Sequence, residues 1–378
     1  MTSQAVDLSR PDGPTRATPG AGPAAPSDTQ AADQFAGRMI EVLNNASLAL
    51  MLSIGHRVGL FDVLDGMPPS TSTDLAAAAG LSERYVREWL AAMVTGRVVT
   101  YDPAQDTYQL PATHAVSLVR ASGPDNLARM MQYVPLLAGV EEPIVACFRT
   151  GGGVPYSSYP RFHQLMAEDS AAVFDAALLA EIVPLVPALP ARLQAGIDVA
   201  DIGCGQGHAI NLLATAFPAS RFTGYDFSAE SIDAATRAAE DRGLTNVRFR
   251  LQDVTDLGQW DAYDLITAFD AIHDQAQPAR VLAGIAQALR ADGVYLMVDI
   301  RASSRLQDNL DQPLATFLYT ASTLHCMTVS LALDGVGLGT MWGEQVAVRM
   351  LNEAGFRQIA VHTLETDPVN NYYVATKE

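Results

Sequence analysis

The chain has 378 residues, enough for about two domains of roughly 150 residues each. Hydrophobic residues make up 49% and charged residues 17%, which suits packed cores and excludes bulk disorder. The 42 acidic residues outnumber the 24 basic ones, so the net charge is −18 and nucleic acid or anionic lipid is not expected as the main partner.

The numbers and positions of lysine and cysteine exclude further classes of enzyme and kinds of site. Lys377 is the only lysine, which excludes a Walker A motif and disfavours a Schiff-base mechanism. Cys147, Cys204 and Cys326 form no C-x-x-C pair, so we expect neither a metal site nor a disulfide framework. Reduced thiols, the lack of a long apolar run and the lack of a signal-peptide core predict a cytoplasmic protein with no membrane contact.

The N-terminal region divides into a tail and a helix. Residues 1–30 are rich in Pro, Gly, Ala, Ser and Thr and contain no aromatic residue, which predicts a disordered tail. Apolar residues at helical spacing then predict a long amphipathic helix from Phe35 to His56. Its apolar stripe has no evident partner in its own domain, and we therefore expect a homodimer.

Residues 31–120 have the pattern of a winged-helix-like domain. A helix that ends at Gly80 and a second helix capped by Ser82 have helix-turn-helix spacing. Two short β-branched runs, 97–101 and 108–110, predict the wing. Such a domain serves either as a DNA reader or as a packing and dimerisation module.

Charge favours the second of these roles. The domain has six arginines against nine acidic residues, a net charge of −3. The would-be recognition helix carries Glu83 and Glu88 beside Arg84 and Arg87, whereas a DNA reader concentrates positive charge there.

The rest of the chain predicts an α/β fold. Residues 121–195 predict a helical linker and substrate-side helices, interrupted by a loop that starts at Gly151. From 196 to 378, short apolar runs alternate with Ala-rich helical stretches, which predicts a Rossmann-like, doubly wound parallel sheet. The expected strands are 199–202, 221–225, 247–251, 265–268 and 294–300.

The first of these strands runs into a glycine loop. Its pattern is D-x-G-x-G-x-G from Asp201 through Gly203 and Gly205, and not the G-x-G-x-x-G that seats a pyrophosphate. A nicotinamide dehydrogenase is therefore the weaker hypothesis. Asp201 places a carboxylate beside the loop, which suits a cationic amino-acid group.

The later strands end in residues that suit an adenosine. Asp226 ends the second strand, where a carboxylate can accept hydrogen bonds from both ribose hydroxyls, and Phe227 can lie against the adenine. Asp253 follows the third strand and can accept from the adenine amino group. Phe269, at the end of the fourth strand, is expected on the methionyl side.

Residues 197–300 resemble a class I S-adenosylmethionine (SAM)-dependent methyltransferase. A winged-helix-like domain ahead of this core is typical of small-molecule O-methyltransferases and their bacterial relatives, here of an actinobacterial branch. The resemblance implies SAM as cofactor and S-adenosylhomocysteine as product. It implies cofactor contacts from Gly203, Gly205, Asp226, Phe227, Asp253, Val254 and Phe269, with Tyr159 and Phe162 closing over the site.

His273 is the candidate base for methyl transfer. It follows the fourth strand and matches the catalytic His of plant-type O-methyltransferases, although Gln275 stands where that family has Trp. Asp299, at the end of the fifth strand, is the candidate acid that orients it. The alternatives are a histidine satisfied by backbone and a strand-end carboxylate in solvent.

Residues 309–340 are expected to form a cap over the acceptor. Their Tyr, Met and Leu side chains suit an apolar or aromatic acceptor, and equally suit core or a dimer interface. The sequence thus predicts methylation of a small aromatic or natural-product-like metabolite of secondary metabolism, on O, N or C. The alternative from another class is a SAM- or ligand-sensing transcriptional regulator that uses the winged helix.

Overall fold

A computed structural model describes residues 28–377. The expected disordered tail lies outside the described residues over 1–27, and residues 28–30 belong to the helix α1 (Asp28–Arg57). The described chain divides after Ala46 into two compact units. The first contains the N-terminal part of α1, and the second contains everything from Ser47 onward.

The winged helix forms its own core. It consists of α2 (Leu60–Asp65), α3 (Ser72–Ala79), α4 (Glu83–Thr95), the wing strands β1 (Thr100–Asp102) and β2 (Thr107–Gln109), and α5 (Ala112–Ala115). Phe61, Trp89 and Met93 are buried at its centre. Ser82 does occupy the N-cap of α4, but its side chain makes no capping hydrogen bond.

The expected helical linker is present as a chain of short helices. They are η1 (Arg120–Asp125), α6 (Leu127–Met130), α7 (Tyr133–Ala138), α8 (Glu141–Thr150), η2 (Tyr156–Ser158), α9 (Phe162–Ala177), the π-helical η3 (Leu178–Ile182), η4 (Val183–Leu185) and α10 (Leu189–Ala195). The buried Arg129 on α6 pairs with Asp169 on α9 and so ties the linker together. No single described helix is long and apolar enough to span a membrane. The segment from α9 to η4 (Phe162–Leu185) together with α10 has the length and composition of a membrane span, but the two parts are bent by 101° relative to each other.

The C-terminal half is built on a sheet of seven strands in the order β5-β4-β3-β6-β7-β9-β8. The strands are β3 (Asp198–Ile202), β4 (Arg221–Asp226), β5 (Val247–Leu251), β6 (Tyr263–Phe269), β7 (Leu289–Ile300), β8 (Gln358–His362) and β9 (Asn370–Thr376). The first five are parallel, as expected. The sheet as a whole is mixed, because the C-terminal hairpin adds β9 antiparallel to β7 and then β8.

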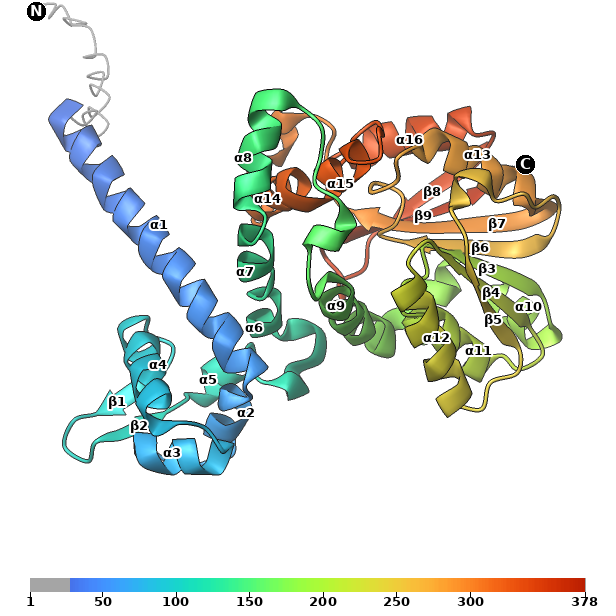
Figure 1. Cartoon of the computed structure of the whole chain (residues 1–378). Helices are drawn as coiled ribbons and strands as arrows, with labels where there is room; N and C mark the ends of the chain where they lie inside the picture. The colour runs from blue at the N-terminus through green and yellow to red at the C-terminus, as the bar shows by residue number, and fades with distance from the viewer. Residues whose placement is uncertain (1–27, 378) are drawn as a thin grey trace, which may run out of the picture. The chain divides into compact units, whose positions relative to one another are not determined.

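Helices cover both faces of this sheet (Figure 1). One face carries α13 (Pro278–Ala288) and α16 (Gly343–Glu353), and the other carries α10, α11 (His208–Ala216) and α12 (Ala229–Asp241). Alternate residues of β7 serve the two cores: Tyr295 enters one and Leu296 the other. Between β7 and α16 lie η6 (Leu306–Asn309), α14 (Ala315–Ala321), the π-helical η7 (Ser322–Cys326) and α15 (Met327–Leu331).

Candidate active site

A cavity of about 350 Å³ opens at the carboxyl ends of β3, β4, β5 and β6. This edge is where open α/β sheets bind ligands, because the loops that follow neighbouring parallel strands meet there. Most of the residues singled out in the sequence line it. They are Phe162, Asp201, Gly203, Gly205, Asp226, Phe227, Asp253, Val254 and Phe269.

The glycine loop brings backbone close to the cavity. Gly203 (φ +70°) and Gly205 (φ +51°) adopt left-handed conformations that side chains disfavour, and a Cβ on Gly203 would lie 2.5 Å from that of Ala271. The Gly205 N–H donates to Asp226 Oδ2 at 2.9 Å, and the Ser228 N–H donates to Asp226 Oδ1 at 2.8 Å. Backbone donors therefore fix the carboxylate that the sequence assigns to a ribose.

The cavity has a strongly acidic lining. Five aspartates line it, whereas no arginine or lysine among the described residues does; the five are Asp201, Asp226, Asp253, Asp270 and Asp274. Burial raises the pKa of Asp201 to about 7, although the Thr267 hydroxyl donates to it at 2.7 Å. Such a wall attracts a cation and repels a pyrophosphate, so the residues present fit the sulfonium and ammonium groups of SAM.

Aromatic rings close the other side of the cavity. Tyr156 contacts Phe227 edge-on at 5.4 Å between ring centroids and stacks on His163 at 5.8 Å. Tyr159 is not among the lining residues. It is buried behind Phe162, where its hydroxyl donates to the Leu324 carbonyl.

His273 lies beneath this cavity, buried and held by carboxylates on both sides. Its Nδ1 is 2.8 Å from Asp299 Oδ1, and its Nε2 is 3.3 Å from Asp274 Oδ1. Burial alone lowers the pKa of His273, but Asp299 and then Asp274 outweigh it and raise that pKa well above its ordinary value. Both alternatives from the sequence are wrong, since the ring bonds to side chains and Asp299 is fully buried.

Asp299 is itself oriented by two further donors. Its Oδ1 accepts from the Trp342 indole N–H at 2.9 Å and from the Ile300 N–H at 2.8 Å, while its Oδ2 has no hydrogen-bond partner. Three segments far apart in the chain therefore meet at this carboxylate. Neither His273 nor Asp299 lines the cavity; Asp274 does, and connects them to it.

Sequence reasoning gave no individual role to three residues of this site. Tyr156 donates to Asp274 Oδ2 at 2.7 Å. Trp342 belongs to a Gly-Thr-Met-Trp-Gly run whose glycine at 343 permits close packing against the backbone of Ser304. Asp270 has a left-handed backbone (φ +51°) and an unpartnered, buried Oδ1, and burial raises its pKa well above the usual value.

The expected cap contributes little to the cavity. Of residues 309–340, only Leu333 lines it. Other residues of this segment pack against neighbouring elements: His325 stacks on Phe162 at 3.7 Å between ring centroids, and Leu318 enters a small core. Burial lowers the pKa of His325 to about 4.

Comparisons with known proteins agree with this architecture. Residues 46–120 match the family model of the Rv2258c-like winged HTH domain, and residues 193–355 match that of a methyltransferase domain. The chain therefore carries a methyltransferase domain behind a winged-helix domain. These matches confirm the predicted fold class and the resemblance to a methyltransferase core that follows a winged-helix-like domain.

Individual relatives extend the comparison. The methyltransferase YcgJ of Bacillus subtilis (strain 168) is 32% identical over 110 residues, which are 29% of this chain and 43% of that protein. The match thus spans less than half the length of this curated relative. Among solved structures, the mitomycin 7-O-methyltransferase MmcR covers 92% of this chain and 99% of its own, with a TM-score of 0.68 and 20% identity. Human N-acetylserotonin methyltransferase, in complex with SAM, covers 94% and 99%, with a TM-score of 0.64 and 16% identity.

Proposed function

We propose that this protein transfers a methyl group from SAM to a small, apolar or aromatic metabolite, with His273 as the general base. The observation that carries the proposal is the buried His273–Asp299 pair, which Asp274 connects to an acid-lined cavity at the carboxyl edge of the sheet. When bound, SAM supplies an electrophilic methyl group next to a positive sulfur. The chain's own task is to bind, align and exclude water.

The cavity residues divide the binding of the cofactor among themselves. Asp226, already fixed by two backbone N–H groups, accepts from the ribose hydroxyls. Asp253 and Val254 bind the adenine edge, and Phe227 packs on its face. Asp201 attracts the cationic amino-acid end, because it lines the same cavity beside the glycine loop.

The base must lose a proton before it can accept one from the acceptor. Two carboxylates raise the pKa of His273, so the imidazolium is stabilised in the free protein. A cation in the cavity opposes that charge and favours the neutral ring. Asp299 then holds the Nδ1 proton in place, which leaves the Nε2 lone pair to receive the acceptor's proton.

The acceptor side has an apolar lining. Phe162, Met166, Phe174 and Leu333 face the cavity, and the first three come from α9. Aromatic and thioether groups pack well on a flat ring. These residues support an aromatic metabolite as acceptor.

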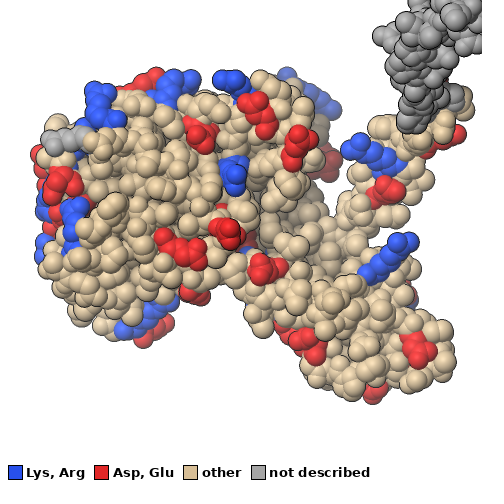
Figure 2. Space-filling view, turned by 180° about the vertical axis from the view of Figure 1, so that it is seen from behind, with Lys and Arg blue, Asp and Glu red and all other residues tan. Residues whose placement is uncertain are grey.

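The winged helix in this proposal serves packing and dimerisation. On the face seen in Figure 2, the lobe that holds α2 to α5 shows more acidic than basic groups. The arginines of α4 are paired within the helix, Arg84 with Glu88 and Arg87 with Glu83. Exposed Phe35 and Ile40 on α1 suit a second copy of the chain.

Two measurements test this role of the winged helix. Light scattering should give a dimer, and a gel shift with random DNA should give no complex. A monomer or a DNA complex would refute this role.

The test of the main proposal follows the methyl group. The protein is incubated with methyl-labelled SAM and a metabolite extract, as wild type, as His273→Ala and as His114→Ala, a control histidine near the wing. We expect label in a small molecule with wild type and control, and at least ~10²-fold less with His273→Ala. Equal transfer by His273→Ala would exclude the base, and no transfer by any form despite SAM binding would exclude the activity.

A further inference from the structure

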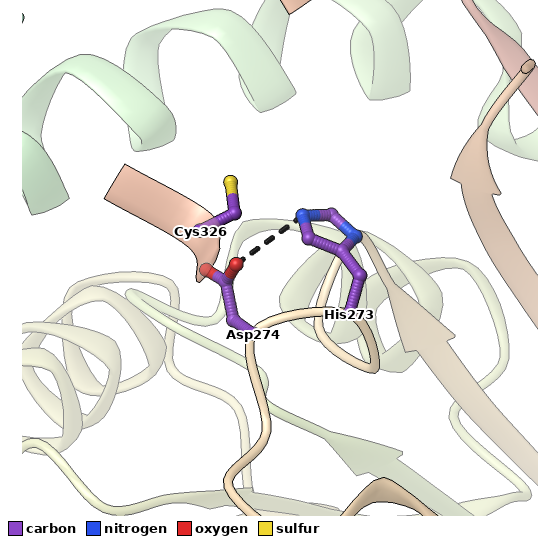
Figure 3. A group of neighbouring side chains, drawn as sticks. All are labelled: His273, Asp274 and Cys326. Atoms are coloured by element: carbon purple, nitrogen blue, oxygen red, sulfur yellow. Dashed lines mark ion pairs between the residues drawn. The ribbon is translucent and has the colours of Figure 1, made fainter. Parts of the chain in front are cut away.

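Three side chains with metal-binding atoms meet at the base. His273, Asp274 and Cys326 each offer one such atom, and all three atoms lie within 4.8 Å of one another (Figure 3). His273 and Asp274 come from the loop after β6, whereas Cys326 comes from η7 above them. Their separation in the sequence is why cysteine spacing alone predicts no metal site.

The distances suit a small tetrahedral ion. Ligand atoms around Zn²⁺ lie about 3.3–3.6 Å apart, given metal–ligand bonds of roughly 2.0–2.3 Å. His273 Nε2 and Asp274 Oδ1 already lie 3.3 Å apart. The Cys326 Sγ lies within 4.8 Å of both of these atoms, so a shift of about 1 Å brings it to bonding distance of the same ion.

Neighbouring groups already orient two of the ligands. A metal-binding histidine usually donates its other ring N–H to a carboxylate, and His273 Nδ1 has Asp299 in that place at 2.8 Å. Tyr156 donates to Asp274 Oδ2 at 2.7 Å. Asp274 Oδ1, the oxygen that faces His273, is buried without a hydrogen-bond partner. An unpartnered buried carboxylate oxygen is costly, and a bound cation would satisfy it.

We propose that His273, Asp274 and Cys326 form a three-ligand site for a thiophilic divalent cation of the Zn²⁺ class. The nitrogen, oxygen and sulfur donors suit Zn²⁺ or Co²⁺ and disfavour Mg²⁺ and Ca²⁺, which take oxygen ligands. Binding releases the thiol proton of Cys326 and the Nε2 proton of the His273 imidazolium to solvent, as the sulfur–metal and nitrogen–metal bonds form. The fourth position is left to water, because no other described side chain belongs to the group.

Metal binding and base catalysis exclude each other at this site. Both use the Nε2 lone pair of His273, since Nδ1 is already engaged with Asp299. The ion therefore inhibits methyl transfer and does not assist it. This consequence rests on the proposed function, whereas metal binding itself does not.

Co²⁺ provides a test that needs no catalysis. The full-length apo protein is titrated with Co²⁺, and the thiolate-to-cobalt absorption band is followed for wild type, Cys326→Ser and Cys147→Ser. We expect a single ion per chain and the band in wild type and in the Cys147→Ser control, with the band lost in Cys326→Ser. Asp299→Asn should weaken the affinity by about 10- to 100-fold and keep the band. No binding by wild type, or an unchanged band in Cys326→Ser, would overturn the site.

A second arm measures Zn²⁺ against methyl transfer. Zn²⁺ should inhibit wild type and Cys147→Ser, and a chelator should restore activity; SAM binding by each variant confirms that it is folded. If methyl transfer is insensitive to Zn²⁺ in a protein that shows the cobalt band, the proposal that metal binding prevents base catalysis would be overturned. If wild type transfers no methyl group at all, the proposed function fails while the cobalt result still decides the metal site.

Discussion

The proposed adenosine end of the cavity and the buried base beneath the cavity, here called the base end, hold their carboxylates in different ways. At the adenosine end, Asp226 and Asp253 accept from backbone N–H groups, which come from Ser228 and Thr255, each two residues further along the chain, and for Asp226 also from Gly205 in the glycine loop. At the base end, Asp299 bonds to His273 and Trp342, which other segments supply. The first arrangement uses backbone donors alone, whereas the second depends on side chains that distant segments supply.

This difference predicts how each end responds to substitution. A carboxylate held by backbone N–H groups keeps one of these bonds when an amide replaces it, so the main loss is the charged contact with the ligand. A buried carboxylate shared by several donors cannot change without altering every group that bonds to it. Variants at the base end should therefore have the larger effects.

Asp299→Asn should have the largest effect. An amide can present its NH₂ group to His273 Nδ1, which forces the proton onto Nε2 and blocks the base. Methyl transfer should fall about 10³-fold, while the affinity for SAM stays within about twofold. Steady-state kinetics and calorimetry measure the two quantities. Asp292→Asn, on the same strand but with its side chain 81% exposed, is the matched control and should behave as wild type. A matching loss in the control, or normal transfer by Asp299→Asn, would contradict the orienting role.

Asp226→Asn should have the second largest effect, and this effect should be confined to the affinity for SAM. Its amide oxygen retains one backbone bond but loses the charge that accepts the ribose hydroxyls. Hydrogen bonds to a charged group contribute about 1.5–3 kcal/mol, so SAM should bind about 10- to 100-fold more weakly. Asp256→Asn, an exposed aspartate nearby, serves as control. Unchanged SAM affinity in Asp226→Asn would remove the ribose assignment.

The residues of the proposed adenosine end could be placed at one cavity from the sequence because their signals are local. Each glycine and aspartate follows directly after a strand, and the parallel sheet then brings those positions to one edge. The five parallel strands were predicted for the same reason. The hairpin of β8 and β9 was not predicted, since its position beside β7 depends on long-range pairing.

The base end could be predicted only in part. His273 and Asp299 follow strands and match a known pattern, so their pairing was foreseen. Trp342, Tyr156 and Cys326 reach the same place through loops and a π-helical segment whose course no short motif determines. Tyr159 illustrates the limit: an aromatic position was identified, but packing behind Phe162 keeps it from the cavity.

The pH dependence of SAM binding offers a third test with a smaller expected effect, and it concerns Asp201. Burial raises the pKa of Asp201 to about 7, so its carboxylate is charged above that pH and neutral below it. Only the charged form attracts the ammonium of SAM, so affinity should fall by about tenfold relative to Asp201→Asn as the pH drops from about 8 to about 6. The ligand's own titration is common to both proteins and cancels in the comparison. Parallel pH profiles for the two proteins, measured by calorimetry, would show that Asp201 does not bind the cation.

Trp342→Phe should have the smallest effect and sharpens the account of the base end. It removes one donor to Asp299 while the Ile300 N–H and His273 remain. The loss of one hydrogen bond to a buried carboxylate costs about 1.5 kcal/mol, which should lower the melting temperature by about 3–6 °C. Transfer should fall severalfold, because a less tightly held Asp299 orients His273 less well. Trp260→Phe, at a tryptophan that is 74% exposed, is the control for the substitution itself. If Trp342→Phe melts early but transfers at the wild-type rate, the indole only packs, and two donors are sufficient to orient Asp299.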